Sequence, residues 1–201
     1  GIFGKVTDSH WYGKVYYYDS DRGIPGAIVN NVWKNSQKQW DRNFFAQGSW
    51  QRRFGKYETR VNAKYARDYM RYLNPDTTLM YLDNKFHQDE LYISSANCYT
   101  IIPGWEADVS VDYQWNHITA SLANFAKPVR HTLLGAIATS WRRGPLKAQG
   151  SLLLSHVTDR SQIINGSENL GHRTKSLTRW TPAFFLSWRP GMDRGPSLRA
   201  F

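Results

Sequence analysis

The stretch from Trp105 to Trp115 alternates strictly between apolar and polar residues. Successive side chains of a β-strand point to opposite faces, so this segment predicts a strand with one apolar and one polar face. Val109 and Val111 belong to the apolar face, and Asp108 and Asp112 belong to the polar face. Strands of soluble sheets usually have about 5–6 residues, whereas a tilted strand needs roughly 9–11 residues to cross a bilayer. This segment has the length of a membrane-crossing strand.

Similar segments recur along the chain. The strands expected from alternation and turn residues cover 10–18, 40–51, 57–65, 91–102, 105–116, 131–142, 146–157 and 177–189, with the start of a ninth at 197–201. Several have aromatic residues at both ends, namely Trp40 and Trp50, Tyr57 and Tyr65, Trp105 and Trp115, and Trp180 and Trp188.

The connections between these strands alternate between long and short. Long loops are expected at 19–39, at about 67–90, at 117–129 and at 158–176, and short turns lie between them. Short periplasmic turns and long extracellular loops are typical of outer-membrane barrels. The pattern therefore predicts an all-β, antiparallel up-and-down meander that forms part of a transmembrane β-barrel.

Composition limits the other classes of protein. The chain of 201 residues has a net charge of +10 and a mean hydropathy of −0.60, and it lacks the run of about 18 apolar residues that a membrane-spanning helix needs. Its basic residues are spread over the sequence instead of clustered, so no nucleic-acid partner is expected. The single cysteine, Cys98, excludes an intramolecular disulfide.

Two segments resemble the barrel region of TonB-dependent outer-membrane receptors. The first is Gly-Ile-Pro-Gly-Ala at 23–27, followed by Trp-Asp-Arg-Asn at 40–43; the second is Trp-Thr-Pro-Ala-Phe-Phe-Leu-Ser-Trp-Arg-Pro at 180–190. Members of that family have an N-terminal plug domain and a barrel of about 22 strands. The resemblance implies that residues 1–201 are a partial barrel of eight to nine strands, without the plug domain.

The resemblance also implies a function. A receptor of this family, in the outer membrane of a bacterial cell, takes up a scarce nutrient (a siderophore, haem, cobalamin or a glycan) with energy supplied through TonB. The implied partners are outer-membrane lipid, the receptor's own plug domain, the TonB system and the nutrient. Two alternatives stay open: a soluble or surface β-domain that binds an anionic polymer through its basic surface, and a small complete barrel closed by these strands alone.

Two sets of residues are candidates for a site. The polar side chains expected to line the lumen are Glu58, Arg60, Asn62, Lys64, Glu106, Asp108, Asp112, Lys147 and Arg179. They are more readily explained by salt bridges to the plug and to neighbouring strands than by ligand contact. The aromatic residues that could stack on a ligand are Tyr16, Tyr18, Tyr69, Tyr72, Tyr92 and Trp115. The simpler interpretation of these is an aromatic girdle at the membrane interface.

The sequence does not indicate catalysis. Its six histidines lack metal-ligand spacing, and no nucleophile or phosphate-loop motif is present. Asp19 and Asp21 are too few for a Ca²⁺ ion, which takes about six to eight oxygen ligands. The chain is therefore predicted not to be an enzyme and to need no metal or cofactor.

Overall fold

The computed structural model describes residues 1–24, 37–75, 81–166, 168–188 and 198–200. Most of the first expected loop, and residues 25–27 and 189–190 of the two resembling segments, lie outside the described residues. Within the described ranges, no helix is long and apolar enough to cross a membrane.

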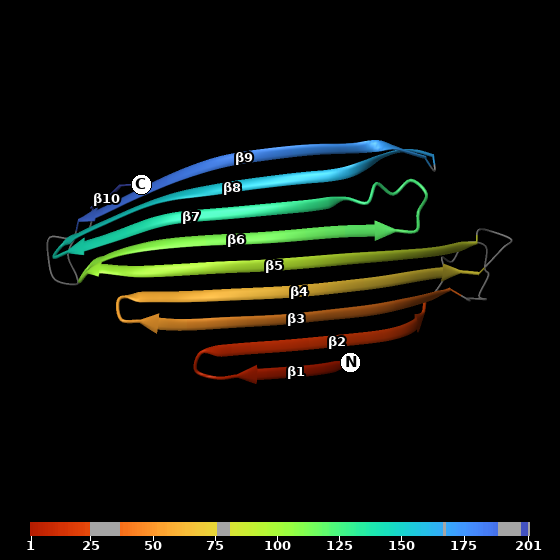
Figure 1. The fold of residues 1–201 in the computed structure, drawn as a ribbon, viewed down its shortest axis with the longest axis horizontal. Coiled ribbons are helices and arrows are strands. Elements are labelled where there is room, and N and C mark those ends of the chain that lie inside the picture. The colour runs from red at the N-terminus through yellow and green to blue at the C-terminus, as the bar shows by residue number, and fades with distance from the viewer. Residues whose placement is uncertain (25–36, 76–80, 167, 189–197, 201) are drawn as a thin grey trace.

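The described residues form a single antiparallel sheet whose strands follow the order of the sequence (Figure 1). The strands are β1 (Ile2–Thr7), β2 (Trp11–Gly23), β3 (Lys38–Phe54), β4 (Tyr57–Asn74), β5 (Leu82–Ile102), β6 (Trp105–Ala120), β7 (Val129–Arg143), β8 (Leu146–Asn165), β9 (Glu168–Trp188) and β10 (Leu198–Ala200). The predicted all-β antiparallel meander is confirmed. The strand β1 was not predicted from the sequence.

Tight turns join strands at one end of the sheet. Two residues separate β3 from β4, β5 from β6, and β7 from β8, and each turn contains a glycine with positive φ: Gly55 (59°), Gly104 (84°) and Gly144 (56°). Two-residue hairpins need this left-handed backbone, which glycine adopts without steric cost. At Gly104 a side chain would also clash with the backbone carbonyl of Arg142.

The connections at the other end are shorter than predicted because the strands continue into the expected loops. The fourth long loop, at 158–176, is wrong: β8 continues to Asn165 and β9 begins at Glu168. The second loop is also mostly strand, since β4 extends to Asn74 and β5 begins at Leu82. Here hydrophobic alternation ends, but backbone pairing does not.

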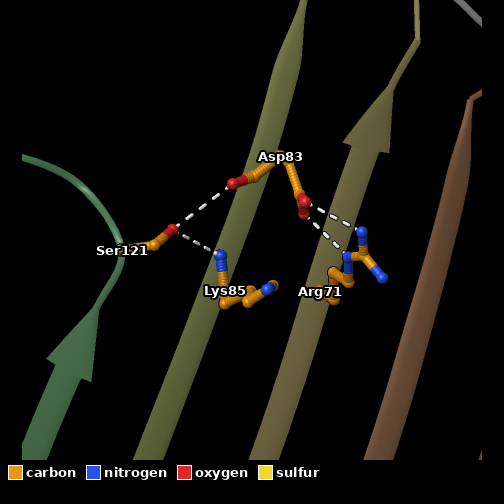
Figure 2. A network of polar contacts seen from close by, with 4 residues as sticks. All are labelled: Arg71, Asp83, Lys85 and Ser121. Atoms are coloured by element: carbon orange, nitrogen blue, oxygen red, sulfur yellow. Dashed lines mark hydrogen bonds and ion pairs between the residues drawn. The ribbon is translucent and has the colours of Figure 1, made fainter.

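Polar cross-strand contacts hold these extensions together (Figure 2). The Arg71 guanidinium in β4 donates two hydrogen bonds to the Asp83 carboxylate in β5, at 2.7 and 2.8 Å. The Ser121 hydroxyl accepts a hydrogen bond from the Lys85 backbone N–H at 2.9 Å and donates one to the Asp83 carbonyl at 3.4 Å. These bonds fix the start of the β6–β7 connection against β5.

The sheet is an open single layer. None of the described hydrophobic residues is buried, and the buried polar residues are Thr59 and Ser94. The strands β1 and β2 lie at the opposite side of the sheet from β9 and β10 (Figure 1), and no contact joins the two groups in the described ranges. The alternative of a small barrel closed by these strands alone is therefore wrong for this structure.

Candidate functional site

The strand register sorts the side chains onto two faces. Residues directly opposite each other in neighbouring antiparallel strands share a face. We call the face of Val109 and Val111 the apolar face, and that of Asp108 and Asp112 the polar face. The register then assigns each residue of β1–β9 to one of them.

The apolar face carries a band without charged side chains that crosses eight strands. It comprises the apolar-face residues within 11–17 of β2, 44–50 of β3, 57–65 of β4, 91–99 of β5, 105–115 of β6, 133–141 of β7, 146–154 of β8 and 180–188 of β9. We call it the apolar band. Its large side chains are open to the surroundings, with Ile137 61% and Phe184 60% exposed.

Aromatic residues mark both edges of the apolar band. The edge near the two-residue turns, the turn-side edge, has Trp11, Trp50, Tyr57, Tyr99, Trp105, Trp141 and Trp188; the opposite, loop-side edge has Tyr17, Phe44, Tyr65, Trp115 and Trp180. Most of the aromatic ends expected from the sequence therefore bound the band. Trp40 does not, because it lies beyond the loop-side edge, with the Arg71 guanidinium 5.1 Å from its ring centre.

The apolar band runs obliquely across the strands. The row of paired residues through Trp50, at the turn-side edge in β3, reaches β9 at Trp180, eight residues from the turn-side edge at Trp188. The row through Phe44, at the loop-side edge, reaches β9 at Thr174, six residues from Trp180. The same two rows pass through Trp11 and Tyr17 of β2, so these shifts accumulate over the seven steps from β2 to β9. With about 3.4 Å per residue and about 4.8 Å per strand, the strands are tilted from the perpendicular of the band by roughly 30–40°.

Polar residues inside the apolar band bond to one another. The Asn97 side chain in β5 accepts a hydrogen bond from the Thr59 hydroxyl at 2.8 Å, and its amide donates to the Ser95 hydroxyl at 3.0 Å. Thr59 is only 7% exposed. This interior of the band therefore carries polar groups whose hydrogen-bonding capacity is used within the sheet.

The structure places all of the polar residues expected to line the lumen on the polar face, where several contact neighbouring strands. Lys64 forms a salt bridge to Glu90 at 3.1 Å, and the Asn62 amide donates to the Ser94 hydroxyl at 2.9 Å. Arg60 donates through Nε to the Gln51 side chain at 2.9 Å. The partners Gln51, Glu90 and Ser94 were not predicted, since naming them requires the register.

The aromatic candidates do not form one site. Four of them lie on the polar face, namely Tyr16, Tyr18, Tyr72 and Tyr92, and two lie on the apolar face, namely Tyr69 and Trp115. Tyr16 is 5.7 Å from the Phe45 ring, the Tyr72 hydroxyl donates to Gln37 at 2.9 Å, and the Tyr92 hydroxyl donates to Asp112 at 3.2 Å. These three therefore have local partners within the described residues.

Charged groups beyond the band shift one another's pKa. Hydrogen bonds from Arg71 lower the pKa of the Asp83 carboxyl, and those from Arg130 lower the pKa of Asp159. On the polar face, burial and then the nearby Glu90 raise the pKa of Asp68. Across the described ranges, no cluster of three or more His, Cys, Asp or Glu side chains could hold a metal ion.

A depression on the apolar face was not predicted from the sequence. It has a volume of about 260 Å³ and is lined by Tyr17, Arg42, Phe44, Arg67, Tyr69 and His87. The lining residues come from four strands, so no contiguous sequence motif predicts them. The one sequence signal is Arg42, which interrupts the apolar side of β3.

Comparison with known proteins does not place the chain in a family. No family model matches it, and no curated protein matches it. The two faces of the sheet are therefore the basis on which a function is proposed.

Proposed function

We propose that the chain is part of the wall of a transmembrane β-barrel in a bacterial outer membrane, with the apolar band against lipid and the polar face toward the lumen. The observation that carries this proposal is the continuous, charge-free band with aromatic edges across eight strands. Outer-membrane barrels have an apolar belt of this kind flanked by aromatic girdles. In water, so large an apolar surface would favour aggregation.

The slope of the apolar band supports the same proposal. A strand that crosses a membrane obliquely meets the two interfaces at residues that shift from strand to strand. Membrane barrels tilt their strands by about 35–45°, and the band gives roughly 30–40°. A soluble sheet has no reason to keep an apolar band at this slope across eight strands.

Within this barrel, we propose a role in TonB-energised uptake of a scarce nutrient, a siderophore, haem, cobalamin or a glycan. Support comes from the two segments that resemble TonB-dependent receptors and from the polar face, whose charged and polar side chains suit contact with a plug domain. The nutrient, the plug and the TonB system are the proposed partners. The alternative, a basic surface that binds an anionic polymer, leaves the apolar band unexplained.

A pair of adjacent substitutions tests the membrane assignment. Val111, which is 48% exposed, lies in the apolar band, and Ser110 lies next to it on the polar face. Val111→Arg should weaken folding into phosphatidylcholine vesicles by about 2–4 kcal/mol, as expected for Arg on the lipid side near the midplane. Ser110→Arg should have a much smaller effect. Urea titration followed by tryptophan fluorescence measures both.

The opposite result identifies a water-soluble domain. Arginine at an exposed position of a soluble sheet leaves stability nearly unchanged. If both variants and the original chain fold without vesicles or detergent, and with equal stability, the membrane assignment is wrong.

Nutrient uptake needs a separate test in cells. Deleting the gene that encodes the chain should abolish accumulation of one labelled nutrient among an iron–siderophore complex, haem, cobalamin and an oligosaccharide. A protonophore should abolish the same uptake in the parent strain. Unchanged accumulation of all four would refute the receptor role and leave the membrane assignment to the Val111 experiment.

A further inference from the structure

The depression on the apolar face combines two arginines with aromatic walls. Its lining residues belong to two adjacent rows of the sheet: Tyr17, Phe44 and Arg67 form one row, and Arg42, Tyr69 and His87 form the next. The Tyr69 and His87 rings lie 4.7 Å apart, and the Arg42 guanidinium lies 5.9 Å from the Tyr69 ring centre. The rows bring together groups from β2, β3, β4 and β5.

Both guanidinium groups are accessible to a ligand. The Arg42 and Arg67 side chains are 57% and 58% exposed, and their Nε atoms lie 3.2 and 3.6 Å from the carboxylates of Asp19 and Asp89. Exposed ion pairs of this kind contribute little free energy, so an additional anion can share or replace the carboxylate. A guanidinium presents several N–H donors in a planar fork that suits phosphate oxygens.

His87 adds an unused polar atom beside these arginines. Its Nδ1 is buried and lacks a hydrogen-bond partner among the described residues. Buried polar atoms of native proteins are usually satisfied. The depression is therefore lined by two cationic groups and by a histidine ring. The Nδ1 atom of that ring has no hydrogen-bond partner among the described residues.

The position of the depression indicates its ligand. Tyr17 and Phe44 belong to the loop-side edge of the apolar band, whereas Arg42, Tyr69 and His87 lie one row beyond it. If lipid tails cover the band, this row lies at the depth of the lipid headgroups. A lipid bound here would have its chains along Val15 and Ala46 and its headgroup between the arginines.

We propose that this depression binds the phosphate-bearing headgroup of a membrane lipid. The inference rests on the proposed membrane function and extends it, because it adds a specific lipid site to a surface otherwise covered by interchangeable lipid. The two arginines hold the phosphate, Tyr69 and His87 form the polar wall, and Tyr17 and Phe44 contact the start of the acyl chains.

The test compares lipid binding by matched variants of the full chain in dodecyl maltoside micelles. Phosphatidic acid is titrated in, with diacylglycerol and inorganic phosphate as separate arms, and bound lipid is counted by native mass spectrometry. Arg42→Gln combined with Arg67→Gln should weaken phosphatidic acid binding about tenfold or more, the loss expected for two charge-assisted contacts. The control is Arg160→Gln, since Arg160 lies in the same row as Arg67 but in β8.

A more conservative pair of substitutions tests the same site if the double glutamine variant does not fold. Arg42→Lys with Arg67→Lys keeps both charges but removes the forked donors, and should weaken binding by about threefold. Equal binding of phosphatidic acid by the original chain, the lysine variant and Arg160→Gln would overturn the proposal. Equal binding of diacylglycerol would also overturn it.

The remaining outcomes separate this site from the membrane assignment. If the chain folds in micelles but inorganic phosphate binds as tightly as phosphatidic acid, a free anion is the ligand and the lipid proposal is wrong. If the chain is monomeric and folded without detergent, the membrane assignment itself fails, together with the lipid site. Selective loss of phosphatidic acid in the arginine variants supports both.

Discussion

At the scale of single residues, Asn97 shows how the apolar band tolerates polar groups. An amide in a lipid-facing surface is costly unless it is hydrogen-bonded. Asn97 accepts from Thr59 and from Tyr57 and donates to Ser95, so the four side chains form a hydrogen-bonded group across β4 and β5. The polar atoms of the Asn97 side chain are therefore bonded to neighbouring side chains of the sheet.

Removing one partner of the Thr59–Asn97 hydrogen bond should destabilise the folded chain more than removing both partners. Asn97→Ala leaves the buried Thr59 hydroxyl without its acceptor and should destabilise the folded chain by about 1–3 kcal/mol. Asn97→Val combined with Thr59→Val removes both partners and should recover most of that loss. Urea unfolding in phosphatidylcholine vesicles measures the two variants, and equal destabilisation would show that the hydrogen bond is not the cause.

Residue types alone predicted the polar face but not the depression. Glu58, Asn62 and Lys64 share a parity with each other, so their common face could be predicted from one strand. Arg42, Arg67 and His87 come from three strands, and only the register brings them together. Arg42 was visible as an exception to the alternation, but an exception in one strand has no partner until its neighbours are aligned.

At the scale of elements, the strands continue beyond their hydrophobic pattern. In the band, one face is apolar and the other polar, so alternation predicts the strand. Beyond it charged side chains occur on both faces, and the regular two-residue period disappears although the pairing of β4 with β5 and of β8 with β9 continues. Loops were predicted there for this physical reason, and β1, with only six residues, offered too short a pattern.

The strand extensions should loosen in acid. The Asp83 carboxyl has a pKa below its usual value because Arg71 donates hydrogen bonds to it, and the unfolded value is about 3.9. A lowered native pKa contributes stability above the unfolded value, and this contribution is lost as the pH falls through the native one. Cleavage by pepsin at the end of β4 and at the start of β5 should therefore accelerate below about pH 4.

The variant Asp83→Asn serves as the control for this experiment. It cannot titrate, so its extensions should be cleaved quickly at every pH tested, after correction with an unstructured peptide. A wild-type cleavage rate with the same pH dependence as the peptide would show that the Arg71–Asp83 contact does not hold the extension.

At the scale of the whole molecule, the sheet has two open sides. β1 pairs with β2 alone, and at the other side β10 covers only Leu186, Ser187 and Trp188 of β9 in the described ranges. Unpaired strand edges readily pair with other strands. In a closed barrel, further strands would occupy these edges.

The chain alone should therefore associate with itself. Analytical ultracentrifugation in neutral detergent should show oligomers whose proportion rises with protein concentration. Phe3 and Thr7 lie on the polar face of β1. Phe3→Lys combined with Thr7→Lys adds charges of the kind that protect natural edge strands, and should shift the distribution toward monomers. A concentration-independent monomer of the original chain would contradict the open edges.

The absence of buried hydrophobic residues from the described sheet has a calorimetric consequence. Globular proteins absorb additional heat when they unfold, about 12–15 cal/mol/K per residue, because their interiors become hydrated. This sheet has no such interior to hydrate. Its heat-capacity change on unfolding should therefore depend on the surroundings of the apolar face, and the same chain should give different thermograms in different lipids.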